Sequence, residues 1–339
     1  IAVNEAKRLD YGIEFALFFD DQASKEAVSF IEWLKANDIT PSVILILHKS
    51  EYTTPDCVAD SVARRFKNAF PDVKIATGTN GNFAQLNRYR PASSMNDLLC
   101  YSVHPQEHAS DLRTLTENVA AQKDTVLSSK TFSSGKGIWV SPVNIQRRFN
   151  ANIEYYERPY AGKGVPPQVD PRLMSLYGAC WTVGSLKHLA ESEPEGITYF
   201  ETAGERGIIQ GDRPSRWPDV FPAKKGMIFP VYFVFLFLLK HKSWKVLQTL
   251  SSDPLKAECL GFSESNIENF MIVNFTSETQ KVKILDFNGL FNIRQLNAHN
   301  CNDAIYDASW LEKSESEKSD LIKPLILEPF SISFLEKII

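Results

Sequence analysis

Residues 14–47 read EFALFFDDQASKEAVSFIEWLKANDITPSVILIL, and this stretch decides the fold class. It contains two apolar runs of strand length, at residues 14–19 and 42–47. Between these runs, apolar side chains recur at helical spacing at Ala27, Phe30, Ile31 and Leu34. Fully apolar strands separated by an amphipathic helix predict a parallel sheet that is buried on both faces.

The same alternation continues as far as residue 240. Further apolar runs predict strands at residues 73–77, 98–103, 138–140 and 197–200. Helical patterns cover residues 170–190 and 227–240. In the first of these, Asp170 suits the N-cap and Pro171 suits the first helical position.

A series of β/α units fits a closed (β/α)8 TIM-type barrel or an open doubly wound sheet. No GxGxxG motif follows the first strand, so a dinucleotide-binding sheet gains no support and we predict the α/β barrel. The pattern gives about six strands, whereas a closed barrel has eight. We therefore expect either that two units precede Ile1 or that the barrel is incomplete.

Short alternating strands replace the β/α pattern after Ser243. They are predicted at residues 257–262, 270–275, 282–286 and 330–335. Such strands, separated by turn residues, are typical of an antiparallel β-sandwich. We therefore divide the chain into a catalytic barrel at residues 1–242 and a C-terminal β domain at residues 243–339.

The composition excludes several classes of protein. The formal charge of -4, from 37 basic and 41 acidic residues, argues against a nucleic-acid partner. The longest apolar run, residues 227–239, is too short to span a bilayer and contains Pro230, so no membrane partner is expected. Five widely spaced cysteines form no CxxC pair, which argues against a cysteine zinc site and fits a reducing, cytoplasmic compartment.

In a β/α barrel the active site lies at the carboxyl ends of the strands. Polar residues follow every predicted strand at that position, and they define the candidate rim: Asp20, Asp21, His48, Asn80, His104, Gln106, Glu107, His108, Ser141, Asn144, Glu201 and Arg206.

Glu201 is the strongest catalytic candidate on this rim. It ends the strand Ile-Thr-Tyr-Phe-Glu, where the period of two places it on one face with Ile197 and Tyr199. A rim carboxylate can act as a general base, an acid or a nucleophile. The plainer alternative is a structural ion pair with a nearby arginine such as Arg206.

The densest polar cluster is His104-Pro105-Gln106-Glu107-His108. Its letters fit the zinc-protease pattern H-x-x-E-H. That motif requires a helix, whereas Pro105 pushes His104 into extended geometry, so we expect neither a catalytic metal nor a cofactor. The better interpretation is a polar lip in which His104, His108 or Glu107 takes part in catalysis and Gln106 binds substrate.

Arginines and amides gather in the connections beside the lip. Asn87 and Arg88 lie in a long connection after the third strand, and Asn144 and Arg148 follow the fifth. Together with Arg206 they are predicted to bind an anionic substrate, product or transition state. For any single arginine, a solvated surface position is the simpler interpretation.

Five stretches in order resemble the D-apionate lactonase family. They are NRYRP (residues 87–91), HPQEHASD (104–111), VSPVNIQRRFN (140–150), VDPRLMSLYGACWTVGSLKHL (169–189) and ITYFETAGERG (197–207). The resemblance implies an N-terminal β region, a central barrel and a C-terminal β domain. It also implies hydrolysis of the branched-sugar lactone D-apionolactone to its open carboxylate.

The preferred hypothesis is therefore metal-free hydrolysis of a sugar lactone. Glu201 or a lip histidine would activate water, and Asn87, Gln106 or an arginine would stabilise the oxyanion. One alternative is a retaining glycoside hydrolase with Glu107 and Glu201 as its carboxylate pair. A second is a non-catalytic carbohydrate-binding barrel that uses tryptophan platforms, with Trp139, Trp181 and Trp217 as candidates.

Overall fold

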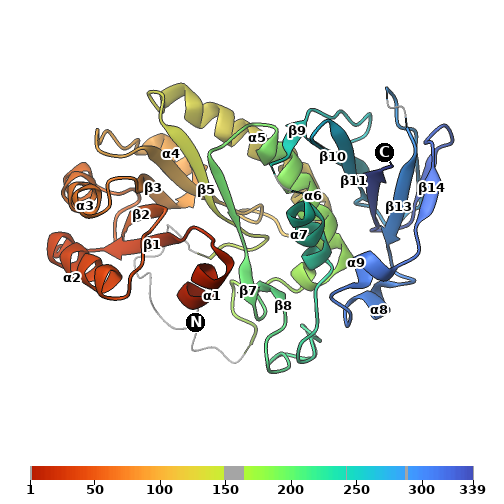
Figure 1. Cartoon of the computed structure of the whole chain (residues 1–339), viewed down its shortest axis with the longest axis horizontal. Coiled ribbons are helices and arrows are strands. Elements are labelled where there is room, and N and C mark those ends of the chain that lie inside the picture. Colours follow the sequence, from red (N-terminus) through yellow and green to blue (C-terminus); the bar gives the residue numbers. More distant parts are fainter. Residues whose placement is uncertain (1, 149–163, 242, 287–288, 339) are drawn as a thin grey trace.

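The computed structural model describes residues 2–148, 164–241, 243–286 and 289–338. Six strands form one parallel sheet in the order β1-β2-β3-β4-β5-β6 (Figure 1). They are β1 (Glu14–Phe19), β2 (Val43–His48), β3 (Lys74–Asn82), β4 (Leu98–Val103), β5 (Gly137–Val143) and β6 (Gly196–Tyr199). The predicted β/α sheet is confirmed as a TIM-barrel-like half-barrel, and its six strands are two fewer than a closed (β/α)8 barrel has.

Helices cover the outer face of this sheet (Figure 1). They are α1 (Ala2–Leu9), α2 (Ala23–Ala36), α3 (Asp56–Ala69), α4 (Phe83–Arg88), α5 (Leu112–Phe132), the 3-10 turn η1 (Pro171–Met174), α6 (Leu176–Ala190) and α7 (Val231–Lys240). On β2, Ile44 and Ile46 pack against the helices, whereas Leu45 and Leu47 belong to a separate core on the inner face. Burial on both faces explains why the β2 sequence is apolar without alternation.

The helix predicted at residues 170–190 is interrupted, which corrects the sequence interpretation. Asp170 does cap a helical turn, because its carboxylate accepts from the backbone N–H of Arg172, but that turn is only η1. Ser175 is extended, with φ -100° and ψ 165°, and its hydroxyl caps α6 by accepting from Gly178 N. The break frees Asp170 and Arg172 from a regular helix.

A partly buried carboxylate connects opposite edges of the half-barrel. Glu14, at the start of β1, accepts from Trp139 Nε1 at 3.0 Å and from Ser141 Oγ at 2.7 Å on β5. It also accepts from Thr198 Oγ1 on β6 at 2.7 Å. Three donors satisfy the charge and connect the first strand of the sheet to the last two.

The C-terminal part is antiparallel. One six-stranded sheet has the order β14-β13-β16-β11-β10-β9, and β12 pairs only with β15. These strands are β9 (Lys245–Leu247), β10 (Ala257–Glu264), β11 (Ile267–Asn274), β12 (Gln280–Val282), β13 (Phe291–Leu296), β14 (Glu317–Ser319), β15 (Leu325–Leu327) and β16 (Ile332–Lys337). Two helical turns that were not predicted, α8 (Cys301–Ala304) and α9 (Trp310–Lys313), lie between β13 and β14.

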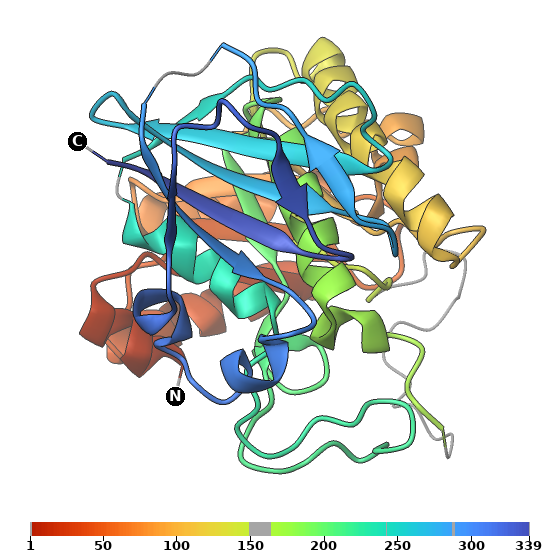
Figure 2. The same ribbon diagram turned by 90° about the vertical axis from the view of Figure 1, so that its right-hand side faces the viewer.

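The large antiparallel sheet lies against α6 and α7, which separate it from the half-barrel (Figures 1 and 2). Phe262 and Phe334 of the sheet stack around Phe237 of α7, with ring centroids 5.8 Å and 5.1 Å away. The other face packs with β12 and β15, through Val282 and Leu325. An antiparallel region after the barrel is thus confirmed, while the domain boundary at residue 243 stays a prediction.

Two composition-based expectations can be compared with the structure. Within the described residues no helix has both the length and the apolar character needed to cross a bilayer. The five cysteines are all free thiols, and Cys100 and Cys180 are buried in the core.

Candidate functional site

The candidate site lies at the carboxyl ends of β4, β5 and β6, which are adjacent in the sheet. Two groups of polar side chains occupy this rim. The carboxylate–arginine cluster consists of Glu201, Arg148 and Arg206, and the polar lip consists of residues 104–111 after β4. Strands two places apart are separated by about 10 Å, so both groups can face one small substrate.

Glu201 is held by guanidinium groups on one of its two oxygens. Arg206 Nη2 lies 2.8 Å from Oε1 and Arg148 Nη2 lies 3.5 Å from the same atom. No described residue contacts Oε2 at hydrogen-bond distance, and the Glu201 side chain is 31% exposed. The carboxylate is therefore oriented through Oε1, and its side chain is partly exposed.

Phe200 determines where Glu201 points. Ile197 and Tyr199 face the helices, and Tyr199 packs on Phe235 of α7, so regular alternation would turn Glu201 the same way. Phe200 adopts a left-handed conformation with φ 42°, which ends β6 and breaks the alternation. Glu201 instead begins β7 (Glu201–Ala203), which pairs with β8 (Gly207–Ile209). The predicted common face of Ile197, Tyr199 and Glu201 is therefore wrong, although Glu201 does lie at the rim.

The polar lip contains a second accessible carboxylate, Glu107. Its Oε2 accepts from Asn82 Nδ2 at 3.3 Å and lies 3.7 Å from His104 Nε2. The Glu107 side chain is 34% exposed, whereas that of His104 is 4% exposed. Three hydrogen-bond acceptors lie together here: the Glu107 carboxylate, the Asn82 amide oxygen and an imidazole nitrogen of His104. Asn82 and His104, the two neighbours of the carboxylate, are uncharged.

His104 is kept neutral by its surroundings. Its pKa is lowered to about 4, mainly by burial. Glu107 partly opposes this shift and Arg147 adds to it. Its Nδ1 atom and the Oδ1 atom of Asn82 are buried with no hydrogen-bond partner among the described residues. Buried polar atoms without partners are costly, so these two atoms can each gain a hydrogen bond when a ligand or water is bound.

The two groups meet at consecutive residues after β5. Arg147 acts electrostatically on His104 of the lip, and Arg148 contacts Glu201. Neighbouring Cα atoms are about 3.8 Å apart, so this pair of arginines links the lip to the carboxylate–arginine cluster. Sequence reasoning had placed Arg148 and Arg206 beside the site, and both contact Glu201.

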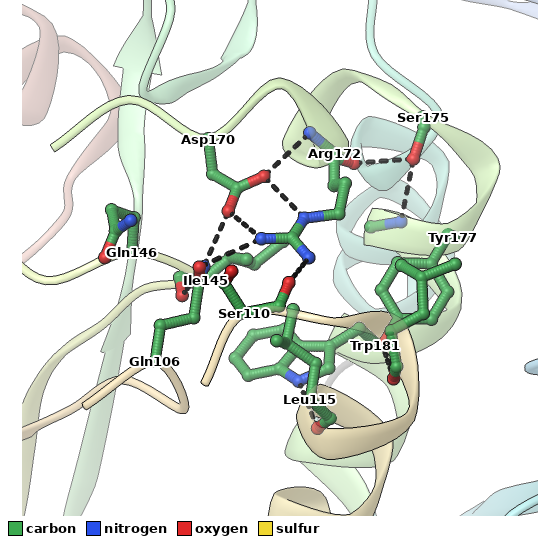
Figure 3. Close-up of polar contacts among 12 residues, drawn as sticks. Gln106, Ser110, Leu115, Ile145, Gln146, Asp170, Arg172, Ser175, Tyr177 and Trp181 are labelled. Atoms are coloured by element: carbon green, nitrogen blue, oxygen red, sulfur yellow. Dashed lines mark hydrogen bonds and ion pairs between the residues drawn. The ribbon is translucent and has the colours of Figure 1, made fainter. Parts of the chain in front are cut away.

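Gln106 belongs to a buried hydrogen-bond network (Figure 3). Its Nε2 donates to Ile145 O at 2.7 Å and to Asp170 Oδ2 at 2.6 Å. Its Oε1 accepts from Arg172 Nη2 at 2.9 Å. Because both amide hydrogens are already used, Gln106 is better described as a structural residue of the lip than as a donor to an oxyanion.

The remaining predicted residues lie farther from this centre. Asn87 and Arg88 end α4 and are exposed, and the side chain of Asn87 bonds Arg90 at 2.7 Å. His108 is exposed on the lip outside any helix, so the H-x-x-E-H letters do not form a helical zinc motif. Asn144 is buried, and its backbone N–H donates to Val103 O beside His104.

Three residues of this region were missed from the sequence: Asn82, Arg172 and Glu14. Asn82 could have been found, since it follows the predicted third strand by only a few residues. Arg172 was assigned to a helix interior, and Glu14 opens an otherwise apolar strand, which is itself a signal for a buried, bonded carboxylate. The described part of the chain contains no group of three or more His, Cys, Asp or Glu side chains that could hold a metal ion.

Comparison with known families supports the barrel. The family model described as D-apionate lactonase, TIM barrel domain, matches residues 1–243. No curated protein sequence matches the chain.

Several solved structures share the fold. An arabinofuranosidase aligns with a TM-score of 0.66 and 13% identity, over 99% of this chain and 78% of its own. A family 51 α-L-arabinofuranosidase from Bifidobacterium longum gives 0.60 and 11%, over 99% and 78%. A GH39 β-xylosidase from Caulobacter crescentus gives 0.53 and 12%, over 93% and 71%. At these identities the likeness concerns the fold alone, a glycoside-hydrolase-like barrel followed by β structure.

Proposed function

Because the chain belongs to the D-apionate lactonase family, as its match over residues 1–243 shows, we propose that it hydrolyses a sugar-derived lactone. The proposed substrate is D-apionolactone and the product is D-apionate. The observation that carries this proposal is the setting of Glu201, whose ion-pair partners among the described residues are two arginines.

Glu201 is the proposed general base and acid. Its Oε2 atom takes a proton from water while the water oxygen bonds to the lactone carbonyl carbon. When the tetrahedral intermediate collapses, the bond to the ring oxygen breaks and Glu201 returns the proton to that oxygen. The products are a free hydroxyl and a carboxylic acid, which loses its proton to solvent to give the carboxylate, and Glu201 is regenerated without a metal ion.

Arg148 and Arg206 are the proposed oxyanion donors. Each uses one nitrogen on Glu201 Oε1, and a guanidinium group has further N–H donors in a fixed fork. Donors that are oriented before the reaction stabilise the developing negative charge on the carbonyl oxygen. The same two arginines would also bind the carboxylate of the product.

The polar lip is the proposed binding surface for the sugar hydroxyls. Hydroxyl groups need acceptors, and the Glu107 carboxylate, whose side chain is 34% exposed, provides one. His104 is less suited to be the base that attacks, because its side chain is 4% exposed and its pKa is about 4. Asn87 and Arg88, exposed at the end of α4, are left with a secondary role in binding.

The retaining glycosidase is the rival candidate. It needs two dedicated carboxylates about 5–5.5 Å apart, one of which must carry a proton. Glu201 and Glu107 extend from strands that are two places apart, and Glu201 is compensated by two guanidinium groups. The binding-only alternative loses two of its three platforms, because Trp181 is buried and Trp139 bonds Glu14 inside the half-barrel.

A substrate panel tests the proposal. The full chain is incubated with aldonolactones, including D-apionolactone, and with nitrophenyl glycosides, in the presence and absence of a metal chelator. Acid release from a lactone that persists with chelator, without nitrophenol release, is expected. Nitrophenol release without lactone opening would favour the glycosidase, and sugar binding without either product would favour the binding-only barrel.

A further inference from the structure

Asp170, which is buried, and Arg172, which is partly exposed, form an ion pair that none of the catalytic steps uses (Figure 3). Arg172 Nε lies 2.8 Å from Asp170 Oδ1 and Nη2 lies 2.5 Å from Oδ2. The Asp170 residue is 6% exposed. Hydrogen bonds from Arg172 and Gln106 outweigh burial and lower the pKa of Asp170, so the pair is ionised.

The pair is bonded to both segments that carry the site. Arg172 Nη2 donates to Gln106 Oε1, and its Nη1 donates to the carbonyl of Ser110, so the lip is held at two points. Gln106 in turn donates to Ile145 O, in the segment after β5, and to Asp170. One guanidinium group and one amide therefore connect three separate stretches of chain.

These bonds are made close to the residues that the proposed function needs. Gln106 lies between His104 and Glu107 in the lip, and Ile145 precedes Arg147 and Arg148 by two and three positions. A third contact, from Asn118 Nδ2 to Pro105 O at 3.1 Å, fixes the start of the lip to α5. Movement of either segment would change the separation between the lip and the carboxylate–arginine cluster.

We propose that Asp170 and Arg172 are positioning residues that hold the polar lip and the Arg147–Arg148 segment in register. This inference rests on the proposed function, because it assigns the pair a role in that reaction. Neither residue contacts the substrate: both act through Gln106 and Ile145. Misplacement of reacting groups by about 1 Å can cost about a hundredfold in rate, so a fixed separation has a direct kinetic value.

The variants separate positioning from folding. Asp170→Asn keeps the shape but removes the charge, and Arg172→Lys keeps the charge but loses the planar fork. Gln106→Met is the safer variant, because it leaves the Asp170–Arg172 ion pair and the bond from Arg172 to Ser110 in place and removes only the bonds that Gln106 makes to the pair and to Ile145. Arg113→Lys is the matched control: it alters another arginine–carboxylate pair, with Glu117 on α5, that is exposed, and it keeps the backbone N–H and the positive charge that act on Asp111 of the lip.

Two readouts are measured on each folded variant: kcat and KM for the lactone, and hydrogen–deuterium exchange of peptides covering residues 104–111 and 144–148. We expect kcat to fall by about tenfold to a hundredfold with KM changed little, and exchange to accelerate in both peptides, for Gln106→Met, Asp170→Asn and Arg172→Lys. Arg113→Lys should match the wild type in both readouts.

The outcomes distinguish this inference from the proposed function. An active wild type whose Gln106→Met variant keeps its kcat, or keeps slow exchange in both peptides, overturns the positioning role and leaves the lactonase proposal standing. A wild type that opens no lactone overturns the proposed function, and the exchange experiment then decides alone whether the pair holds the two segments.

Discussion

Arg206 Nη2 lies 2.8 Å from Glu201 Oε1, and this contact fixes the orientation of a partly exposed carboxylate on the rim. In Glu201→Gln the shape is kept, but the proton acceptor and the negative charge are lost. We expect kcat to fall by at least about a hundredfold, the lower range for removal of a general acid or base. The fold should survive, because the side chain is partly exposed.

The control for this variant lies in the same turn. Among the described residues, the hydrogen bond that Glu205 accepts is a long one, 3.4 Å from Arg216 N, so Glu205→Gln should keep the wild-type rate. Steady-state kinetics and thermal unfolding of both variants make the comparison. A folded Glu201→Gln enzyme with a rate near wild type would leave Glu201 with only a structural role.

Arg148 is expected to act on the transition state. Arg148→Ala should lower kcat by about a hundredfold to a thousandfold, as removal of one oxyanion donor does in other enzymes. Arg216→Ala removes an exposed arginine from the loop after β8 and should have no such effect. An Arg148→Ala variant that raises KM at constant kcat would assign the residue to ground-state binding and contradict the proposed oxyanion role.

His104 should make the stability of the protein depend on pH. Its pKa is about 4 in the folded chain and about 6.5 in an unfolded one, so between these values only the unfolded chain binds the proton. Above about pH 6.5 His104 is neutral in both states and the full stability is present. As the pH falls towards 4, the unfolded chain is stabilised by a proton that the folded chain does not bind, and the free energy of unfolding falls by on the order of 3 kcal/mol in total.

Urea unfolding at several pH values between 4 and 7 measures this effect. In His104→Gln the part of the slope due to His104 should disappear, whereas His299→Gln, at an exposed turn, should leave the slope unchanged. An identical slope in the wild type and in His104→Gln would show that the imidazole is not buried in its neutral form.

Phe200 should respond unusually to glycine. Its φ of 42° is unfavourable for any residue with a Cβ, and glycine adopts it freely. Both Phe200→Ala and Phe200→Gly lose a buried ring, but the glycine variant should be the more stable of the two by about 1 kcal/mol.

Phe19, a buried residue that ends β1 and whose φ is not positive, provides the comparison. There the glycine variant should be less stable than the alanine variant, by about 0.5–1 kcal/mol. If chemical denaturation ranks the alanine and glycine variants in the same order of stability at both positions, Phe200 does not hold a strained conformation that directs Glu201.

The local parts of the fold were predictable from the sequence. The observed bounds of β1 and β4 are the predicted ones. For β4 the reason is burial on both faces, which makes the strand an uninterrupted apolar run. The rim rule selected Glu201 and Arg206, which lie 2.8 Å apart beyond the end of β6. Those inferences need only the spacing of apolar residues along the sequence and the common direction of parallel strands.

The rest depends on contacts between distant residues. Nothing near Glu14 in the sequence indicates that its donors are Trp139, Ser141 and Thr198, between 125 and 184 positions away. Asp170 was correctly recognised as a cap, but whether one helix or two followed was decided by the extended conformation of Ser175. The use of the Gln106 amide by Ile145 and Asp170 was likewise invisible before the loops were placed.

Lactone opening at the rim can be measured directly as the release of acid. Purified full chain is mixed with D-apionolactone at neutral pH, and acid release is followed by titration against the spontaneous rate, alongside Glu201→Gln. We expect the wild type to release acid well above the spontaneous rate, and we expect the enzymatic rate of the variant to be at least about a hundredfold lower than that of the wild type. Release at the spontaneous rate by a folded wild type, or equal rates for the two proteins, would contradict this expectation.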